Sequence, residues 1–488
     1  MNRKFSDQEL IRRAKLKELQ EANCDPFQVQ SVKRTMTLAE FLQKYKSIKK
    51  ESDTKICLVG RVMAIRQTFG KIQDFSGQAQ FYLNKTKINA KIFEYFKKYV
   101  DIGDIVEIYG TPFKTHVGEL TLNVLKIRIV SKSLKPLPEK WHGLQDEELR
   151  ARQRYVDLIM NNESMKTFVM RSQIIKHIRT YLDGKGFIEV ETPILQSKLG
   201  GAAARPFTTK HNVLKRDYYL RIATEISLKK LIVGGFEKIF EIGRIFRNEG
   251  MDSTHNPEFT SMELYLAYAG MDEIMDVTEK IFHYVSKQLK IPFVEIEGNK
   301  IYLNKKFKII NMIDFIKEVV GVDFHKINTL KESLDVAKKH KIHVENHQKA
   351  KGHIINLFFE AFCEEKCIQP TFVWGHPVEV SPLSKRNLLM PEYTNRFELF
   401  INKKEYANAF AELNDPIDQY MRFEEQIKEK QMGNEEANEM DMEFIDSLEH
   451  GLPPTGGLGI GIDRMAMLFS GKSTIRDVLL FPHMKEKD

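Results

Sequence analysis

The sequence predicts an α+β fold in two parts: a small β-barrel, then a larger domain built on an antiparallel sheet with flanking helices. Several strand patterns with a single helix among them occupy residues 55–135. Strand patterns without intervening helices recur between residues 151 and 488, which favours an antiparallel sheet over a parallel one. A chain of 488 residues is long enough for two to four domains with ample cores.

The front of the chain is predicted to hold a helix over residues 6–22 and then a run of short strands. The expected strands are 55–68, 77–83, 104–113 and 119–130, with a helix at 89–100. This order suits a Greek-key barrel of the OB type, which binds single-stranded nucleic acid on one face. The expected boundaries are a helical extension over 1–54, the barrel over 55–135 and a linker over 136–150.

The charge is distributed unevenly along the chain. Residues 1–135 contain 26 Lys and Arg against 14 Asp and Glu, a net charge of +12, whereas the whole chain carries +8. A basic module indicates a polyanion partner such as nucleic acid. A solvated Lys-rich surface would give the same charge, so both interpretations stay open here.

The sequence predicts a cytoplasmic protein without membrane contact. No apolar run approaches the roughly 18 residues that a membrane span requires, and the N-terminus has no apolar signal-peptide core. The cysteines fit this compartment. Cys363 and Cys367 supply only half the ligands of a structural zinc site, so free thiols are expected.

The larger domain is expected over residues 151–488. Its strands are predicted near 187–195, 238–246, 259–268, 395–402 and 405–413, bounded by Gly, Asn and Pro. An insertion is expected at about 285–370. Its later part is rich in Lys and His and is predicted to be helical.

A densely charged segment, "FRNEGMDSTHNPEFTSMELY" (246–265), is a candidate site. Strand patterns run into and out of it, and Asn256 with the following proline marks a loop between them. Its charged and polar side chains include Arg247, Glu249, His255, Asn256, Glu258 and Glu263.

A second candidate is the Gly-rich "PPTGGLGIGIDRM" (453–465), predicted to be a strand that leads into a helix near Asp463. It matches neither the dinucleotide-binding fingerprint nor the P-loop. Glycines let a backbone approach a flat ligand closely, and Arg464 beside them can lie over a base or hold a phosphate. A tightly packed strand–helix joint with a surface Arg would explain the same residues.

A third candidate is the hairpin that follows residue 395. Glu398 and Glu405 are expected to face each other across it and to repel unless a cation lies between them, and Mg²⁺ is the usual choice beside phosphates. Asn408, Phe410 and Glu412 alternate and so share one face of a strand. That face suits a small cationic ligand, with a solvated face as the alternative.

The three candidates together predict a site for a nucleoside triphosphate beside a cationic substrate. Fixed cations for phosphates, metal ligands and further acids are all present. They are, in that order, Arg247 and Arg464; Glu398 and Glu405; and Glu225, Glu263 and Glu412.

These segments resemble the motifs of class II aminoacyl-tRNA synthetases, in the same order. Those similar to motifs 1, 2 and 3 are "GFIEVETPIL" (186–195), "FRNEGMDSTHNPEF" (246–259) and "GLGIGIDRM" (457–465). Three others are similar to the lysyl-tRNA synthetase family: "GGAAARPF" (200–207), "HPVEVSPL" (376–383) and "ELNDP" (412–416). The resemblance covers roughly residues 55–488.

The resemblance implies an enzyme that activates L-lysine with ATP to lysyl-adenylate, releases pyrophosphate, and transfers lysine to the 3′ end of tRNA(Lys). It also implies Mg²⁺ as cofactor and a homodimer, with Pro193 at the interface. Arg247 and Arg464 match the catalytic arginines. The implied ATP-binding residues are Arg247, Glu249, His255, Asn256, Phe259, Glu398, Glu405 and Arg464, of which Glu398 and Glu405 match magnesium ligands. The implied lysine-binding residues are Gly201, Glu225, Glu263, Tyr265, Asn408, Phe410 and Glu412. Arg66 and Gln80 match anticodon-contacting positions.

The chain departs from the family pattern at several positions. Thr224 stands where the family usually has Pro, and Ala407 and Ala409 stand where many members have Gly. Between "FGK" and "QDFSG" many members have a further short apolar strand with a Phe, where this chain has only Ile72. The barrel is therefore expected to lack part of its anticodon-stacking surface.

Three alternatives remain at this point. The first is the same chemistry with aspartyl or asparaginyl specificity. The second is a synthetase-like binding protein that has lost catalysis, and the third is a paralogue that joins lysine to a protein. The intact arginines and glutamates argue against the second, and the barrel argues against the third.

Overall fold

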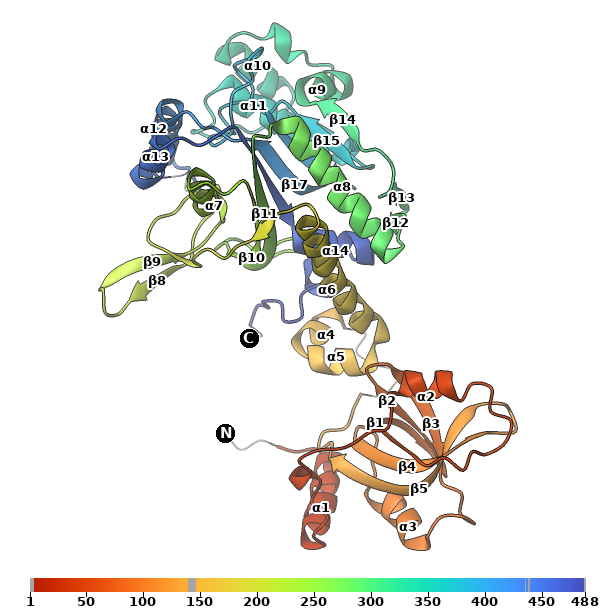
Figure 1. Cartoon of the computed structure of the whole chain (residues 1–488). Coiled ribbons are helices and arrows are strands. Elements are labelled where there is room, and N and C mark those ends of the chain that lie inside the picture. The colour runs from red at the N-terminus through yellow and green to blue at the C-terminus, as the bar shows by residue number, and fades with distance from the viewer. Residues whose placement is uncertain (1–3, 139–145, 435, 438, 487–488) are drawn as a thin grey trace. The chain divides into compact units, whose positions relative to one another are not determined.

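The structure is a computed structural model that describes residues 4–138, 146–434, 436–437 and 439–486. The chain forms two compact units, Met1–Gln145 and Asp146–Asp488 (Figure 1). The predicted linker over 136–150 includes positions 139–145, which lie outside the described residues. Its last residues belong to helix α4 (Glu147–Arg152) of the second unit.

The first unit is a barrel that closes in the order β1-β2-β3-β5-β4 within the described residues, as the OB interpretation predicts. Its strands are β1 (Ile56–Arg66), β2 (Phe69–Asp74), β3 (Gly77–Tyr82), β4 (Ile105–Lys114) and β5 (Leu120–Ser131). Its helices are α1 (Asp7–Glu21), α2 (Leu38–Lys44) and α3 (Ala90–Tyr99). Inward side chains such as Val62, Ile72 and Phe81 are buried and fill the barrel.

The prediction that the barrel lacks a short strand is wrong. β2 starts at Phe69, runs through the "GKIQD" segment, and pairs antiparallel with both β1 and β3. Ile72 within it is a core residue, 1% exposed. The β1–β2 hairpin turns tightly just before this segment: Arg66 pairs with Phe69, and Gln67 adopts a left-handed φ of 54°.

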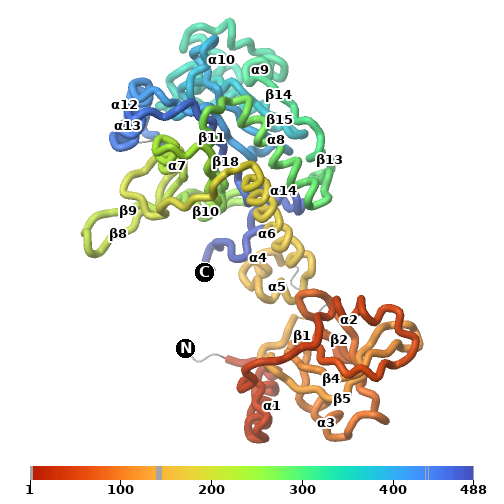
Figure 2. The backbone as a smooth tube through the Cα atoms, viewed as in Figure 1, coloured from red at the N-terminus to blue at the C-terminus, as the bar shows by residue number. Residues whose placement is uncertain are grey.

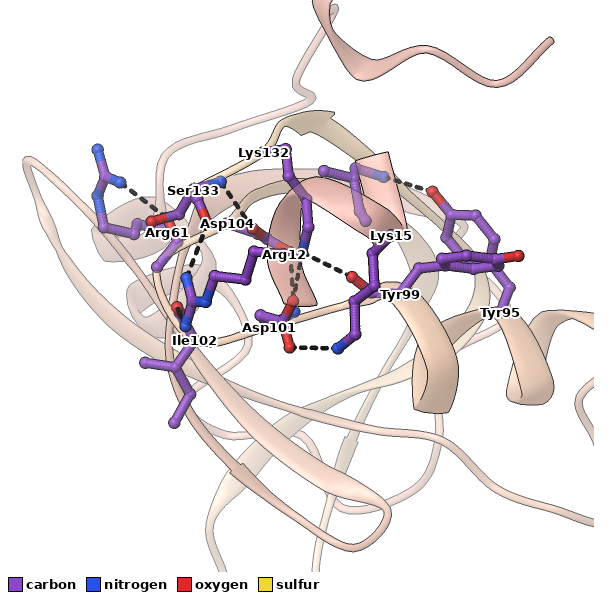
Figure 3. A network of polar contacts seen from close by, with 12 residues as sticks. Arg12, Lys15, Arg61, Tyr95, Tyr99, Asp101, Ile102, Asp104, Lys132 and Ser133 are labelled. Carbon is purple, nitrogen blue, oxygen red and sulfur yellow. Dashed lines mark hydrogen bonds and ion pairs between the residues drawn. The ribbon is translucent and has the colours of Figure 1, made fainter. Parts of the chain in front are cut away.

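Helix α1 is fixed to the barrel by buried polar contacts (Figure 3). Arg12, 7% exposed, donates from Nη1 to the Ser133 carbonyl (2.8 Å) and from Nη2 to the Ile102 carbonyl (3.0 Å). Lys15 on the same helix pairs with Asp101 (2.7 Å). Such contacts satisfy groups that would be costly to bury unpaired.

Apolar side chains complete this attachment. Leu19 of α1, and Leu38 and Phe41 of α2, are buried in the same core as the barrel strands. The segment predicted as an extension over 1–54 thus packs with the barrel in one unit.

The second unit is built on a mostly antiparallel sheet with the order β14-β15-β16-β17-β18-β11-β10-β6 among its described residues. Pairing is antiparallel from β15 to β10 and parallel at both edges. The strands are β6 (Ile188–Glu189), β10 (Lys238–Phe246), β11 (Glu258–Ala267), β14 (Lys308–Asn311), β15 (Thr371–Trp374), β16 (Arg396–Ile401), β17 (Lys404–Ala411) and β18 (Thr455–Gly461).

The single strand predicted over 187–195 is instead two very short ones, β6 and β7 (Leu195–Gln196). β6 pairs with β10, whereas β7 pairs with β9 (Arg216–Leu220). β9 also forms a hairpin with β8 (Thr208–His211), which extends from the body of the unit in Figure 2. A further hairpin joins β12 (Phe293–Ile296) and β13 (Asn299–Tyr302).

Helices cover both faces of this sheet. On one face, α6 (Asn162–Asp183), α8 (Met271–Leu289) and α14 (Ile462–Ser470) form the main core. On the other, α7 (Glu225–Val233), α12 (Pro416–Gln431) and α13 (Met442–Glu449) form a smaller one. The remaining helices are α5 (Arg154–Met160), α9 (Met312–Val320), α10 (Leu330–Lys339) and α11 (Lys351–Phe358).

The segment predicted as an insertion at about 285–370 is partly integrated into the sheet. β14 and β15 lie at one edge of the sheet. The helices α9, α10 and α11 come between these two strands in the sequence and pack around a core that contains Phe324 and Phe358.

Alternation along the central strands separates an apolar face from a polar one. Leu264 of β11, Leu458 of β18, and Ala407 and Ala409 of β17 are buried in the main core. The two alanines noted as departures from the family pattern therefore point into this core. The residues between them carry the polar side chains of the predicted site.

The structure agrees with the expectation of free thiols. All four cysteines are free, and burial raises the pKa of Cys363 and Cys367 to about 12. In the part of the chain that the structure describes, no helix combines the length and the hydropathy needed to cross a membrane.

Candidate active site

A cavity of about 450 Å³ lies on the polar face of the central strands and brings together every predicted ATP- and lysine-binding residue. What each of them binds stays a prediction, but their assembly from distant segments was the main expectation. The lining includes Gly201, Glu225, Arg247, Glu249, His255, Asn256, Phe259, Glu263, Tyr265, Glu398, Glu405, Asn408, Phe410, Glu412 and Arg464.

The floor of the cavity is the part of β18 where glycines leave the polar face of the sheet without side chains. Gly459 pairs with Glu263 of β11 on one side and Asn408 of β17 on the other. Gly457 pairs in the same way with Tyr265 and Phe410. The side chains of β11 and β17 therefore rise on both sides of a strip of β18 that has no side chains on this face, which leaves room for a ligand.

The conformation of Glu412 requires one of these glycines. A Cβ at Gly457 would collide with Glu412 Oε1 and lie 2.8 Å from the Tyr265 ring. Glu412 is 1% exposed. Its Oε1 has no hydrogen-bond partner among the described residues, so it is available to a ligand donor.

Three carboxylates form the acidic end of the cavity: Glu225, Glu263 and Glu412. Burial raises the pKa of all three carboxyls, and for Glu263 burial and the neighbouring Glu225 charge raise it to about 7. Tyr265 Oη donates to Glu263 Oε2 (3.3 Å). Such a cluster lowers its electrostatic energy by binding a cation.

Thr224, a departure from the family pattern, contributes directly to this cluster. Its backbone N–H donates to Glu263 Oε1 at 3.1 Å. Proline has no N–H and could not make this bond. The substitution therefore adds a hydrogen bond that favours the ionised form of Glu263.

Lys229 was missed by the sequence analysis. Its ammonium, 0% exposed, donates to Glu225 Oε1 at 2.5 Å and contacts Glu412 Oε2. Four-residue spacing on a helix places Glu225 and Lys229 side by side, which was the available signal. In a Lys-rich chain that spacing resembles any surface ion pair.

The opposite end of the cavity is basic. Arg247 directly follows β10, and its guanidinium lies 5.2 Å from the centre of the Phe259 ring. Its buried Nε has no hydrogen-bond partner among the described residues. Arg464, at the start of α14, donates from Nη1 to the Glu405 carbonyl (2.6 Å). Both arginines can meet phosphate oxygens.

The loop between β10 and β11 is internally braced. Asp252 accepts bonds from Thr254 and from the His255 backbone and ring. Burial is the largest single effect on the pKa of Asp252 and would raise it, but these hydrogen bonds together outweigh burial and hold the pKa well below its usual range. The buried Asn256 donates from Nδ2 to the Glu258 carbonyl (2.6 Å). The loop thus presents His255 and Glu249 to the cavity from a defined conformation.

Glu398 and Glu405 both line the cavity but are not directly opposite each other, so that expectation is wrong. Glu398 pairs with Asn408, and Glu405 pairs with Phe400, because the register shifts between Leu399 and Phe400. Burial and the Glu398 charge raise the pKa of Glu405. Among the described residues, no group of three or more His, Cys, Asp or Glu is arranged to hold a metal.

Two further charged residues position the site. Arg396 joins the two ends: it pairs with Glu398 (2.5 Å) and donates to Asn408 Oδ1 (3.0 Å). The buried Asp463 accepts from the Thr260 backbone N–H (2.6 Å) and pairs with Arg171 (2.5 Å). Asp463 therefore ties α14, β11 and α6 together at the residue that precedes Arg464.

Arg66 and Gln80 lie in the first unit, on the outer face of the barrel. Phe69 and Tyr82 stack there with ring centres 4.4 Å apart, and Phe113 lies 6.0 Å from Tyr82. The register places Arg66 next to Phe69, and Gln80 lies two residues from Tyr82 on the same face. Gln80 donates to Thr121 (2.9 Å).

Comparison with known families agrees with both units. The profile described as "tRNA synthetases class II (D, K and N)" matches residues 146–485. The profile described as "OB-fold nucleic acid binding domain" matches residues 56–130. Together with the sheet and its cavity, these matches define a class II aminoacyl-tRNA synthetase with an OB-fold module.

Full-length relatives narrow the family further. The lysine–tRNA ligase of Malacoplasma penetrans is 65% identical over 488 residues, all of both chains. That of Ureaplasma urealyticum serovar 10 is 57% identical over 492 residues, again all of both chains. That of Lactococcus lactis subsp. lactis is 53% identical over 99% of each chain. The chain therefore belongs to the lysine–tRNA ligase family, and the resemblance found in the sequence is confirmed.

The acidic end predicts a pH-dependent affinity for a cationic ligand. An ammonium binds the ionised form of Glu263, whose pKa is about 7, so affinity should rise as pH increases from 6 to 8. Calorimetric titration of L-lysine across this range measures the effect. In Thr224→Pro, which removes an N–H bond to the carboxylate, the rise should move to higher pH. Identical profiles for both proteins would contradict this account of Glu263.

Proposed function

We propose that the cavity binds L-lysine at its acidic end and ATP at its basic end. The chain then joins lysine to tRNA(Lys) in two steps: adenylate formation, and transfer to the 3′ end. The observation that carries this assignment is the Glu225–Glu263–Glu412 cluster, in which Glu225 and Glu412 are buried, beside two arginines in one cavity. A side-chain ammonium needs carboxylates, whereas the aspartyl and asparaginyl alternatives need a cation or an amide-reading group there.

In the first step the lysine carboxylate attacks the α-phosphorus of ATP in line, and pyrophosphate leaves. The reaction needs no nucleophile from the protein, so positioning and charge neutralisation supply the catalysis. We assign Arg247 to the α-phosphate, where charge develops, and Arg464 to adenine and the γ-phosphate. Phe259 stacks on adenine, while Glu249, His255 and Asn256 surround the base and the outer phosphates.

Lysine recognition follows from the geometry of the acidic end. Glu225, Glu263 and Glu412 supply negative charge, and Tyr265 and Asn408 supply hydrogen bonds. Phe410 supplies an aromatic wall. Gly201, with φ at +88°, brings the backbone close: a Cβ there would lie 3.0 Å from the Glu225 Cβ.

We assign Mg²⁺ to Glu398 and Glu405. Two acidic side chains from adjacent strands line one cavity, and burial together with the Glu398 charge raises the pKa of Glu405. A divalent ion bound by one or two carboxylates plus phosphate oxygens relieves this repulsion. When bound, Mg²⁺ would neutralise phosphate charge and polarise the reacting phosphoryl group. Arg396 holds Glu398 in place for this role.

We assign anticodon recognition to the outer face of the barrel that carries Arg66 and Gln80. Phe69, Tyr82 and Phe113 form an aromatic row on this face. Aromatic rings on an OB barrel stack on bases, and a basic unit attracts the backbone phosphates.

A homodimer is also part of the proposal. In the segment that resembles motif 1, Pro193 lies among exposed apolar residues, with Ile188, Ile194 and Leu195 between 44% and 54% exposed. β6 in this segment is also an edge strand of the sheet. Exposed apolar groups at a sheet edge are typical of an interface. Sedimentation equilibrium of the full chain tests this assignment.

Amino-acid-dependent ATP–pyrophosphate exchange with each of the twenty amino acids tests the lysine assignment. Lysine should be the only efficient substrate. Glu412→Gln should raise KM for lysine, because losing a buried charge partner costs on the order of 2–5 kcal/mol. The matched control is Glu449→Gln, an exposed carboxylate at the end of α13, which should leave KM unchanged. Efficient exchange with aspartate or asparagine would overturn the assignment.

The aromatic row predicts a separate effect on tRNA. Tyr82→Ala should lower kcat/KM for tRNA charging, because stacking is worth roughly 1–3 kcal/mol per base. Pyrophosphate exchange should not change, since the cavity belongs to the other unit. The control is Phe75→Ala, a 77% exposed ring in the turn between β2 and β3. Equal charging by wild type and Tyr82→Ala would remove this face from the proposal.

A further inference from the structure

Lys229 is a buried cation beside the acidic end of the cavity, without an assigned role. It is 0% exposed on α7, and the described residues that form the cavity wall do not include it. Its ammonium bridges Glu225 on the same helix and Glu412, which follows β17. The rings of Phe410 and Phe444 lie 5.5 and 5.8 Å from the ammonium. Lys229 therefore holds the two carboxylates from behind, leaving the cavity side to a ligand.

We propose that Lys229 is a positioning residue for amino-acid recognition: it fixes the spacing of Glu225 and Glu412 and favours the ionised form of both for an incoming ammonium. The inference rests on the proposed function of this cavity. It adds a fixed, permanent cation to the set of groups that select the substrate.

The charges around the cluster support this role. The titratable and charged side chains in and around the acidic cluster come from four elements. They are Glu225 and Lys229 of α7, Glu263 and Tyr265 of β11, Arg396 of β16, and Glu412 at the end of β17. Burial by itself would lower the pKa of the Lys229 ammonium, but the two glutamates outweigh burial and raise it. Lys229 thus stays charged while it supports both carboxylates.

Without this cation, the two buried carboxylates would repel each other. Like charges in a buried site cannot both stay ionised, so one would take up a proton. Lysine binding would then have to expel that proton, and affinity would fall as pH falls. A purely structural role for Lys229 predicts a loss of affinity without this coupling to protons.

The test is isothermal titration of the full chain with L-lysine between pH 6.5 and 8.5, in buffers of different ionisation enthalpy. In Lys229→Met we expect lysine affinity to fall on the order of 100-fold near pH 7. We also expect up to about one more proton released per lysine bound than in wild type at the same pH, and recovery of affinity as pH rises. Lys229→Gln, which keeps a polar side chain, should show the same extra proton even if the Met variant does not fold.

Two controls isolate the charge. Lys229→Arg keeps the cation and should release the same number of protons as wild type, even if its larger head weakens binding. Lys230→Met changes the adjacent residue, whose ion pair with Glu443 is at the surface, and should bind lysine like wild type. Weaker binding by Lys229→Met and Lys229→Gln without extra proton release would overturn the inference. If wild type itself bound no lysine, the proposed function would fail first, and the inference with it.

Discussion

The site depends on a row of glycines in β18, the strand between the two that carry the polar side chains. Antiparallel pairing places Gly457 and Gly459 between β11 and β17, so opposing side chains rise on either side of an empty floor. A methyl group at Gly457 would displace the Glu412 carboxylate. The opposite face of the same strands is apolar and packed against α6, α8 and α14. A packed apolar core on one face of the sheet thus supports a highly charged cavity on the other.

The charged side chains of the cavity are unfavourable to bury, and nearby residues offset part of this free-energy cost. Buried carboxylates are unfavourable unless paired, and here their pKa values are raised. Lys229 offsets part of that cost from behind, while the N–H of Thr224 and the hydroxyl of Tyr265 bond Glu263. The cluster still has more carboxylates than cations, and the ammonium of a ligand would supply the missing positive charge. At the other end, arginines and the Glu398–Glu405 pair suit phosphates with a divalent ion.

Much of this arrangement could be predicted from the sequence because it follows local pattern. The strand expected at 238–246 is β10, and the Gly-rich strand leads into α14 as expected. The fifteen predicted cavity residues also meet, because the family motifs carry them in order. The family and its two folds are confirmed by the comparisons.

The wrong or missing predictions concern features that depend on strand pairing and tertiary packing rather than on the local sequence pattern. β2 was not recognised because its sequence has a single buried apolar side chain, Ile72, and its strand conformation comes from pairing with β1 and β3. Glu398 and Glu405 are offset because of a register shift that no side-chain alternation reveals. Lys229 and Lys230 are adjacent lysines, yet only tertiary packing decides that the first is buried and the second is not. Arg396 was also not predicted as a site residue, because nothing in the local strand pattern distinguishes it from an ordinary strand arginine.

The central claim is that buried charge, rather than the shape of an apolar pocket, selects the amino acid. The most direct test is the ratio of kcat/KM for L-lysine over L-norleucine, which lacks the terminal ammonium, in ATP–pyrophosphate exchange. A site whose buried polar groups would be left unpaired rejects the analogue by about 10⁴-fold or more, and the account predicts a ratio of that order. A ratio of only about tenfold, the discrimination expected of a hydrophobic pocket, would contradict it.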